Sequence, residues 1–220
     1  ANGAFGPPDW LRARTLLDEA AQTDDVAAHH RALLEAMALD KDGNPATMPT
    51  PDRLSDAPSV QFYRGLVTAE ECAHIIAVAE PMMEPSFVVD PASGRHMANP
   101  VRTSDGTVIG PAREDLVIRA INKRLAAASD TDVLQGETLS VLRYAPGQQY
   151  RMHMDAMPST PNQRIRTMIV YLNDGYAGGE TMFEANGLKV AGRTGDVLLF
   201  DNILPDGRAD PASRHASLPV

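Results

Sequence analysis

A histidine and an aspartate two residues apart, His153 and Asp155, lie in a short segment rich in strand-forming residues. In a β-strand the side chains at positions i and i+2 project from the same face, so this imidazole and this carboxylate would point together. A second imidazole from another strand would complete a 2-His-1-carboxylate set, which holds a metal ion and leaves further coordination positions open. The pattern therefore predicts a metal centre that can bind additional ligands, as an oxygenase requires.

The candidate for the third ligand is His215, near the end of the sequence. Several predicted strands separate it from His153, and such a separation can return a later strand to the side of the first across a barrel. A His-x-Asp pattern alone is common by chance, and a solvated pair on a surface strand is the alternative interpretation. The elements around the pattern therefore decide between these two interpretations.

The second half of the chain has the pattern of a strand array. Short apolar runs are separated by turn residues such as Pro146-Gly147, Gly178-Gly179 and Asn186-Gly187. Short strands at nearly regular spacing are typical of an all-β sandwich or barrel. We expect strands at residues 138–144, 149–155, 166–172, 181–184, 188–191 and 196–201.

Helices are expected before this array. Apolar spacing of three to four residues predicts helices at 9–22, 25–39, 68–80 and 112–128, the third opened by a capping box at Thr68, and a strand at 60–63. Four prolines between residues 43 and 59 indicate a linker. We therefore predict an α+β fold with a double-stranded β-helix (jelly-roll) core and flanking helices. Residues 1–57 would form a small N-terminal helical hairpin and Pro-rich linker, and residues 58–220 the jelly-roll domain.

Composition limits the class of protein. The 220 residues carry 20 Lys and Arg against 29 Asp and Glu, a net charge of −9, which disfavours a nucleic-acid partner. No apolar run is long enough to span a membrane and no signal peptide is visible, so we expect no membrane partner and a cytoplasmic location. The single cysteine, Cys72, is expected to be a buried, inert thiol.

The remaining histidines have structural interpretations. His29 and His30 are adjacent on a predicted helix, so they face different sides and cannot easily share a metal ion. His74 has no ligand-like neighbour in the sequence, and we expect it to be structural or solvated.

The order of motifs in residues 60–220 resembles the prolyl 4-hydroxylase family of 2-oxoglutarate- and Fe(II)-dependent dioxygenases. The motifs are RYAPGQQY (143–150), YRMHMD (150–155), VYLND (170–174), GGETMF (178–183) and SRH (213–215). The resemblance implies that His153, Asp155 and His215 bind Fe(II), with no catalytic residue beyond these ligands. It also implies contacts to 2-oxoglutarate from Tyr144, Tyr171 and Thr181, and to substrate from Arg164, Arg102 and Ser104. Of these, Arg102 and Ser104 lie in residues 101–106, which resemble the family's mobile loop.

The resemblance implies hydroxylation of a C–H bond, in a prolyl residue of a peptide or protein, with ascorbate as an optional cofactor. The family anchors 2-oxoglutarate with a Lys or Arg about ten residues beyond the second histidine, whereas this sequence stops at Val220, five residues beyond it. We expect the native chain to continue and the jelly roll shown here to lack its last strand. Two alternatives remain open: a cupin-like metalloprotein that does not use 2-oxoglutarate, and a non-catalytic binding module.

Overall fold

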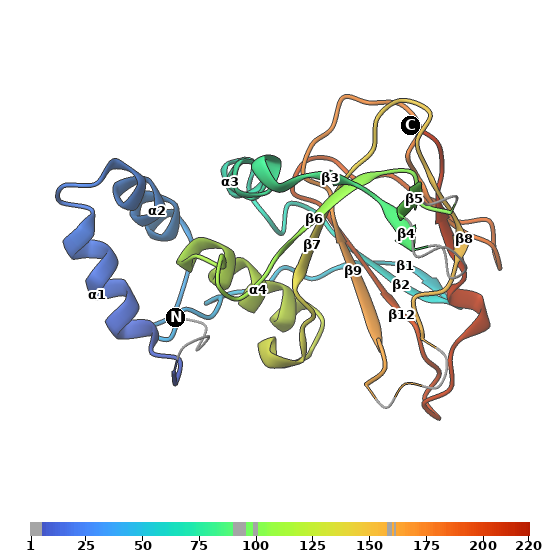
Figure 1. Cartoon of the computed structure of the whole chain (residues 1–220). Coiled ribbons are helices and arrows are strands. Elements are labelled where there is room, and N and C mark those ends of the chain that lie inside the picture. Colours follow the sequence, from blue (N-terminus) through green and yellow to red (C-terminus); the bar gives the residue numbers. More distant parts are fainter. Residues whose placement is uncertain (1–5, 90–95, 99–100, 158–159, 161) are drawn as a thin grey trace.

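The computed structural model describes residues 6–89, 96–98, 101–157, 160 and 162–220. Within these residues, helices cover one side of a set of antiparallel strands (Figure 1). The helices are α1 (Trp10–Ala20), α2 (Asp25–Ala36), α3 (Ala69–Ala79) and α4 (Leu116–Ala128), with 3-10 turns η1 (Glu80–Met82), η2 (Val133–Gln135) and η3 (Pro211–Ser213). The strands are β1 (Asp52–Asp56), β2 (Ser59–Tyr63), β3 (Glu84–Pro85), β4 (Phe87–Val89), β5 (His96–Ala98), β6 (Asp105–Ile109), β7 (Leu139–Arg143), β8 (Tyr150–His153), β9 (Arg166–Val170), β10 (Thr181–Phe183), β11 (Lys189–Val190), β12 (Val197–Asp201) and β13 (His215–Ser217).

Two four-stranded antiparallel sheets form the centre of the fold. The first has the order β1-β2-β12-β9 and the second the order β11-β10-β13-β8. In both sheets, strands that are distant in sequence lie side by side. Smaller sheets, β3-β6-β7 and β4-β5, adjoin them in the described residues. This mixture of helices and antiparallel sheets is consistent with a jelly-roll core.

An apolar cluster fills the space between the two main sheets. Leu198 and Phe200 of β12 pack there with Phe183 of β10, and all three are at most 1% exposed. The alternate residues of β12, Val197 and Leu199, belong to a second cluster on the other face of the first sheet. Because successive side chains of a strand alternate between faces, β12 can be buried on both sides only if nearly every residue is apolar, as it is here.

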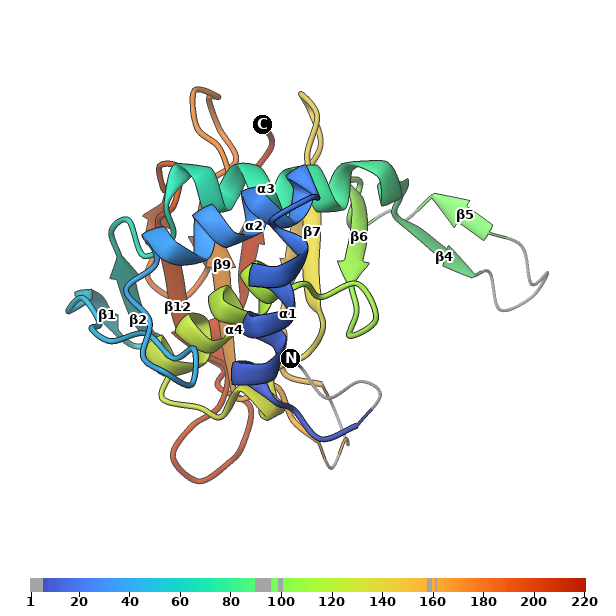
Figure 2. The ribbon, with the colours of Figure 1, turned by 90° about the vertical axis from the view of Figure 1, so that its left-hand side faces the viewer.

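The second cluster joins the sheet to the helices, which lie in front of the strands in Figure 2. Its members include Cys72 and Ile75 of α3, Ile118 and Ile121 of α4, and Leu33 of α2. Helix α2 therefore contributes to the same core as α3 and α4. The boundary predicted near residue 57 stays a prediction, and residues 52–56, expected within the linker, form β1 and pair with β2.

Buried polar contacts fix the helices in place. The expected capping box is present: Thr68 accepts from the backbone of Glu71, and Glu71 accepts from the backbone of Thr68. The Glu71 carboxylate also receives two hydrogen bonds from the Arg124 guanidinium of α4, at 2.6 and 3.0 Å. This nearly buried ion pair ties α3 to α4.

The structure confirms the predicted helices and strands, with bounds that differ by a few residues. Helix α4 begins at Leu116 rather than near residue 112, because Asp115 is its N-cap. The strands between residues 84 and 109 were missed. No described helix is both long and apolar enough to cross a membrane.

Candidate metal centre

Two histidines from different sheet strands face each other. β8 and β13 are antiparallel neighbours, and His153 pairs directly with His215 in their register. Their imidazole rings have centroids 4.3 Å apart. The return of a late strand to the side of β8, expected from the sequence, therefore occurs. His215 is 3% exposed, so its ring lies inside the fold.

Backbone carbonyls fix the orientation of both rings. The Nδ1 of His153 lies 2.8 Å from the carbonyl of Arg151, and the Nδ1 of His215 lies 2.9 Å from that of Ser213. A carbonyl only accepts hydrogen bonds, so each Nδ1 carries the proton and each Nε2 presents a lone pair. Burial lowers the pKa of His215, which favours the neutral ring that a metal ligand requires.

The carboxylate of Asp155 completes the cluster. Its Oδ1 lies 3.4 Å from Nε2 of His153, and its Oδ2 lies 3.8 Å from Nε2 of His215. The three candidate ligand atoms all lie within 4.8 Å of one another. Burial raises the pKa of the Asp155 carboxyl, but the neighbouring His153 ring, a hydrogen bond from Thr167 and the proximity of His215 lower it to about 2. The group is therefore an anion at neutral pH.

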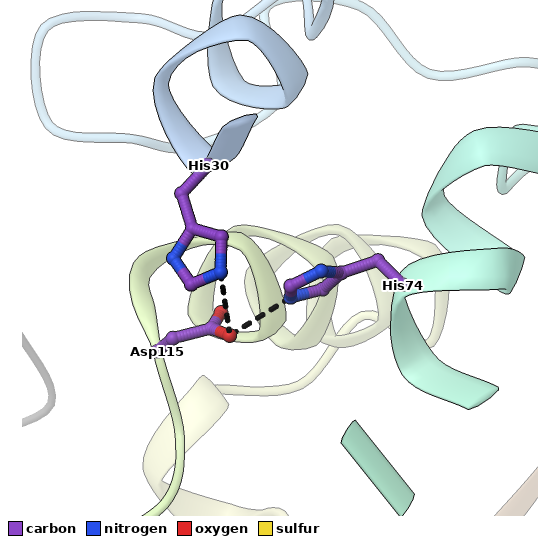
Figure 3. A group of neighbouring side chains, drawn as sticks. All are labelled: His30, His74 and Asp115. Carbon is purple, nitrogen blue, oxygen red and sulfur yellow. Dashed lines mark hydrogen bonds and ion pairs between the residues drawn. The ribbon is translucent and has the colours of Figure 1, made fainter. Parts of the chain in front are cut away.

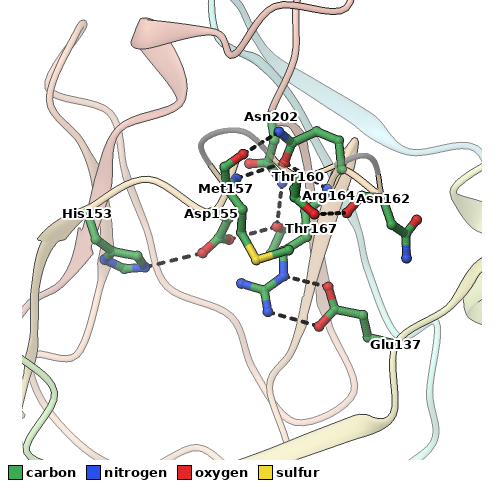
Figure 4. A network of polar contacts seen from close by, with 10 residues as sticks. Glu137, His153, Asp155, Met157, Thr160, Asn162, Arg164, Thr167 and Asn202 are labelled. Carbon is green, nitrogen blue, oxygen red and sulfur yellow. Dashed lines mark hydrogen bonds and ion pairs between the residues drawn. The ribbon is translucent and has the colours of Figure 1, made fainter. Parts of the chain in front are cut away.

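A hydrogen-bond chain behind Asp155 was not predicted from the sequence. The Thr167 hydroxyl of β9 donates to Asp155 Oδ2 at 2.7 Å, and the Asn202 side-chain amide donates to Thr167 at 2.8 Å (Figure 4). Asn202 is fully buried, and its Oδ1 has no hydrogen-bond partner among the described residues. The chain holds the carboxylate in one orientation, as outer partners of metal ligands do.

The aromatic ring of Tyr150 is another neighbour that sequence reasoning missed. It stacks on the His153 ring, with centroids 3.5 Å apart and planes 14° apart. Arg102 is a predicted substrate residue. Its guanidinium lies over the Tyr150 ring, 5.6 Å from the ring centroid. Arg102 also donates to the Ser86 hydroxyl at 3.2 Å. The Tyr150 ring therefore lies next to both Arg102 and the candidate ligand His153.

The three residues predicted to contact 2-oxoglutarate lie along β13 and its neighbour β10. Thr181 is cross-strand partner of Ser217, two residues beyond His215 and therefore on the same face. The Tyr144 hydroxyl lies near Ser217. The Tyr171 hydroxyl lies near Thr181 and donates to the Val190 carbonyl at 3.3 Å. Burial raises the pKa of both tyrosines, that of Tyr171 to about 12, so both hydroxyls keep their protons. The hydroxyl groups of Tyr144, Ser217, Thr181 and Tyr171 thus form a row across β13 and β10.

The other two predicted substrate residues lie apart from each other. Arg164 forms an ion pair with Glu137, with 2.9 Å between Nη2 and Oε2, and it lies near Asp155 in Figure 4. Ser104 is fully buried, and its hydroxyl lies near those of Ser86 and Tyr144. Of the segment predicted as a loop, residues 105 and 106 belong to β6, and Arg102 bridges to Tyr150 of β8.

Residues 139–220 match the model of the 2OG-Fe(II) oxygenase superfamily. Probable prolyl 4-hydroxylase 3 of Arabidopsis thaliana is 36% identical over 221 aligned residues, which cover 89% of this chain and 75% of that protein. This chain belongs to the prolyl 4-hydroxylase family. Probable prolyl 4-hydroxylase 10 of the same plant is 37% identical over 76% of this chain, and the alignment spans 66% of the relative's length.

A solved structure agrees with this family. The viral collagen prolyl hydroxylase of Paramecium bursaria Chlorella virus-1, in its 2OG complex, superimposes with a TM-score of 0.57 at 26% identity. The match covers 73% of this chain and 88% of the viral chain. Membership of the prolyl 4-hydroxylase family makes the protein a 2-oxoglutarate- and Fe(II)-dependent dioxygenase.

The residues present fit the metal that the family uses. Two imidazoles with free Nε2 lone pairs and one anionic carboxylate form the donor set typical of non-haem Fe(II) in oxygenases. Among the described residues, the group of possible metal ligands at this place consists of these three side chains. Three protein ligands leave coordination positions for other molecules. The candidate metal centre of this chain is therefore suited to Fe(II).

Proposed function

We propose that this protein hydroxylates a prolyl residue of a peptide or protein, with Fe(II) bound by His153, Asp155 and His215. The observation that carries the proposal is the convergence of these three ligand atoms within 4.8 Å. The bound iron would supply the activation of dioxygen, coupled to oxidative decarboxylation of 2-oxoglutarate. The protein's own part is to hold three ligands in place and leave the remaining positions accessible.

The hydroxyl row is the proposed site of 2-oxoglutarate. Tyr144, Tyr171 and Thr181 are the proposed contacts to a carboxylate beside His215, and burial keeps both phenols protonated. Tyr171 would have to turn its hydroxyl from the Val190 carbonyl to donate to that carboxylate. The apolar cluster between the two sheets closes the far side and excludes water. We further propose that these sheets form a double-stranded β-helix.

The proposed substrate residues are Arg102, Ser104 and Arg164. Arg102 lies over the Tyr150 ring that stacks on His153, and Arg164 lies near the Asp155 carboxylate. Two cations beside the metal cluster can orient a peptide by hydrogen bonds to its carbonyl groups. The related viral protein is named a collagen prolyl hydroxylase, which supports a proline-rich peptide as the class of substrate. Ascorbate as a cofactor and a cytoplasmic location stay predictions.

The test is turnover with Fe(II), 2-oxoglutarate and a proline-rich peptide. The measured signals are the release of succinate and the gain of one oxygen atom in the peptide. We expect both signals from the wild-type chain and from the control variant His29→Ala, whose exposed side chain lies on α2. We expect neither from His153→Ala. Bound iron without turnover of 2-oxoglutarate would favour the cupin-like alternative, and absence of metal binding would favour a binding module.

A further inference from the structure

A second group of metal-ligand side chains lies among the helices. His30 comes from α2, His74 from α3, and Asp115 is the N-cap residue of α4 (Figure 3). One nitrogen or oxygen atom of each lies within 4.8 Å of the others. The group shares no residue and no secondary-structure element with the proposed iron site.

Both imidazoles face one carboxylate oxygen. Asp115 Oδ2 lies 2.8 Å from Nε2 of His74 and 3.9 Å from Nε2 of His30. The other oxygen, Oδ1, accepts the backbone N–H of Ile118 and caps α4. Helix capping therefore fixes the carboxylate, and its other oxygen is directed at the two rings.

A hydrogen-bond network does not account fully for this arrangement. His74 is within hydrogen-bonding distance of Asp115, but 3.9 Å is too long for a hydrogen bond from His30. The two rings are 4.9 Å apart in an edge-to-face contact. Two imidazoles at this separation, with one anionic oxygen between them, form an arrangement that a cation can bridge.

The protonation states suit a cation. Burial and the neighbouring histidines lower the pKa of His30, although Asp115 opposes this shift. Burial raises the pKa of Asp115, but hydrogen bonds from His74 and the Ile118 backbone lower it below its usual range. A neutral His30 ring and an ionised Asp115 carboxylate are forms that bind metal. The side chains of His30 and Asp115 are each 20% exposed, so an ion can reach them from solvent.

We propose that His30, His74 and Asp115 form a second metal site, which takes a divalent cation of the zinc class and joins α2 to α3 and α4. Two imidazoles and one carboxylate suit Zn²⁺, which binds them at about 2.0–2.2 Å in tetrahedral geometry. Ligand atoms around such an ion lie roughly 3.4 Å apart. The His74–Asp115 separation would lengthen by about 0.6 Å and the His30–Asp115 separation would shorten by about 0.5 Å, which small side-chain rotations can supply.

The fourth position of a tetrahedral ion would remain open to water, since three described residues supply ligands. His29, next to His30, is exposed on the same helix, and its ring centroid lies 6.1 Å from that of His74. It is not part of the ligand group. It therefore provides a matched control with the same residue type, helix and neighbouring position.

The test is Zn²⁺ titration by calorimetry in a His153→Ala/His215→Ala background, which removes both imidazoles of the iron site. We expect this variant to bind one equivalent of Zn²⁺. Adding His30→Ala should abolish that equivalent, whereas adding His29→Ala should leave it unchanged. A background variant without a saturable equivalent, or equal binding by the His29 and His30 variants, would overturn the proposal.

A thermal-melting measurement covers the possibility that a substitution unfolds the chain. Zn²⁺ should raise the melting temperature of the background variant and of the His29→Ala version, because a ligand that binds only the folded state stabilises it. The His30→Ala version should melt cooperatively without that shift. An equal shift in all three would assign the binding to the acidic surface and refute the site. Neither measurement uses enzymatic activity, so the result is independent of the proposed function.

Discussion

The hydrogen bond from Thr167 to Asp155 offers a sharp test of how the metal centre is organised. Thr167→Val replaces the hydroxyl by a methyl group of similar size, so the packing of β9 is largely kept while the bond is lost. The change also leaves the buried Asn202 amide without the acceptor it now has at 2.8 Å. We expect the Asp155 carboxylate to lose its fixed orientation toward the two imidazoles.

The expected loss follows from the type of bond. A hydrogen bond to a charged group contributes about 1.5–3 kcal/mol, which corresponds to roughly 10- to 100-fold in an equilibrium constant. Loss of an outer partner of a metal ligand typically costs about 10–100-fold in metal affinity. The two estimates agree, so Thr167→Val should weaken Fe(II) binding by about 10–100-fold while the chain stays folded.

The assay is anaerobic Fe(II) titration of the wild-type chain, Thr167→Val and Thr167→Ser. The serine variant keeps the hydroxyl and should bind within a few-fold of wild type. Equal affinity of the valine and serine variants would show that Thr167 does not orient the carboxylate, and the reasoning about this chain of bonds would then be wrong.

Three further predictions concern stability, reactivity and pH. Arg124→Met leaves the Glu71 carboxylate, whose side chain is 4% exposed, without its ion-pair partner. Urea unfolding should then give a free energy of unfolding lower by about 3–5 kcal/mol. A loss below about 1 kcal/mol would contradict this prediction. Burial raises the pKa of Cys72 to about 11, so a thiol reagent at pH 8 should label it only after denaturation, as a colour assay can check. Burial lowers the pKa of His215 below 6.5, and protonation competes with metal binding. Metal loading should therefore be complete above pH 6.5 and be lost as the pH falls through the lowered value, as metal retention after dialysis would reveal.

The sequence predicted the group of candidate metal ligands because two of them are close together in the chain. His153 and Asp155 are two residues apart on one strand, and the family's order of motifs supplied His215. The strand array was equally clear, since most strands of the two main sheets have apolar runs bounded by turns, although β1 and β13 do not. Strand β6 was missed because residues 101–106 resemble a loop. The other strands between residues 84 and 98 were missed because β3 has two residues and β4 and β5 have three each. Such short runs have no readable period, and only pairing defines them.

Contacts that depend on register were beyond the sequence. The register between β9 and β12 brings Asn202 near Thr167, and the Thr167–Asp155 hydrogen bond joins β9 of the first main sheet to the residues just after β8 of the second. His30, His74 and Asp115 come from three separate helices, and no spacing connects them. His74 has no ligand-like neighbour in the sequence, but the fold brings His30 and Asp115 beside it. The expectation that His29 and His30 cannot share a metal ion stays a prediction.

The position of β13 has a consequence for the order of folding. This strand follows every other described helix and strand in the chain, yet it lies inside its sheet, between β10 and β8. During synthesis, β8 and β10 must wait for residues 215–217 before either gains its inner neighbour, and this long-range pairing is intrinsically slow. Until then, His153 and Asp155 are only two of the three candidate ligands. The nascent polypeptide therefore cannot assemble the candidate metal centre before every other described strand has been made.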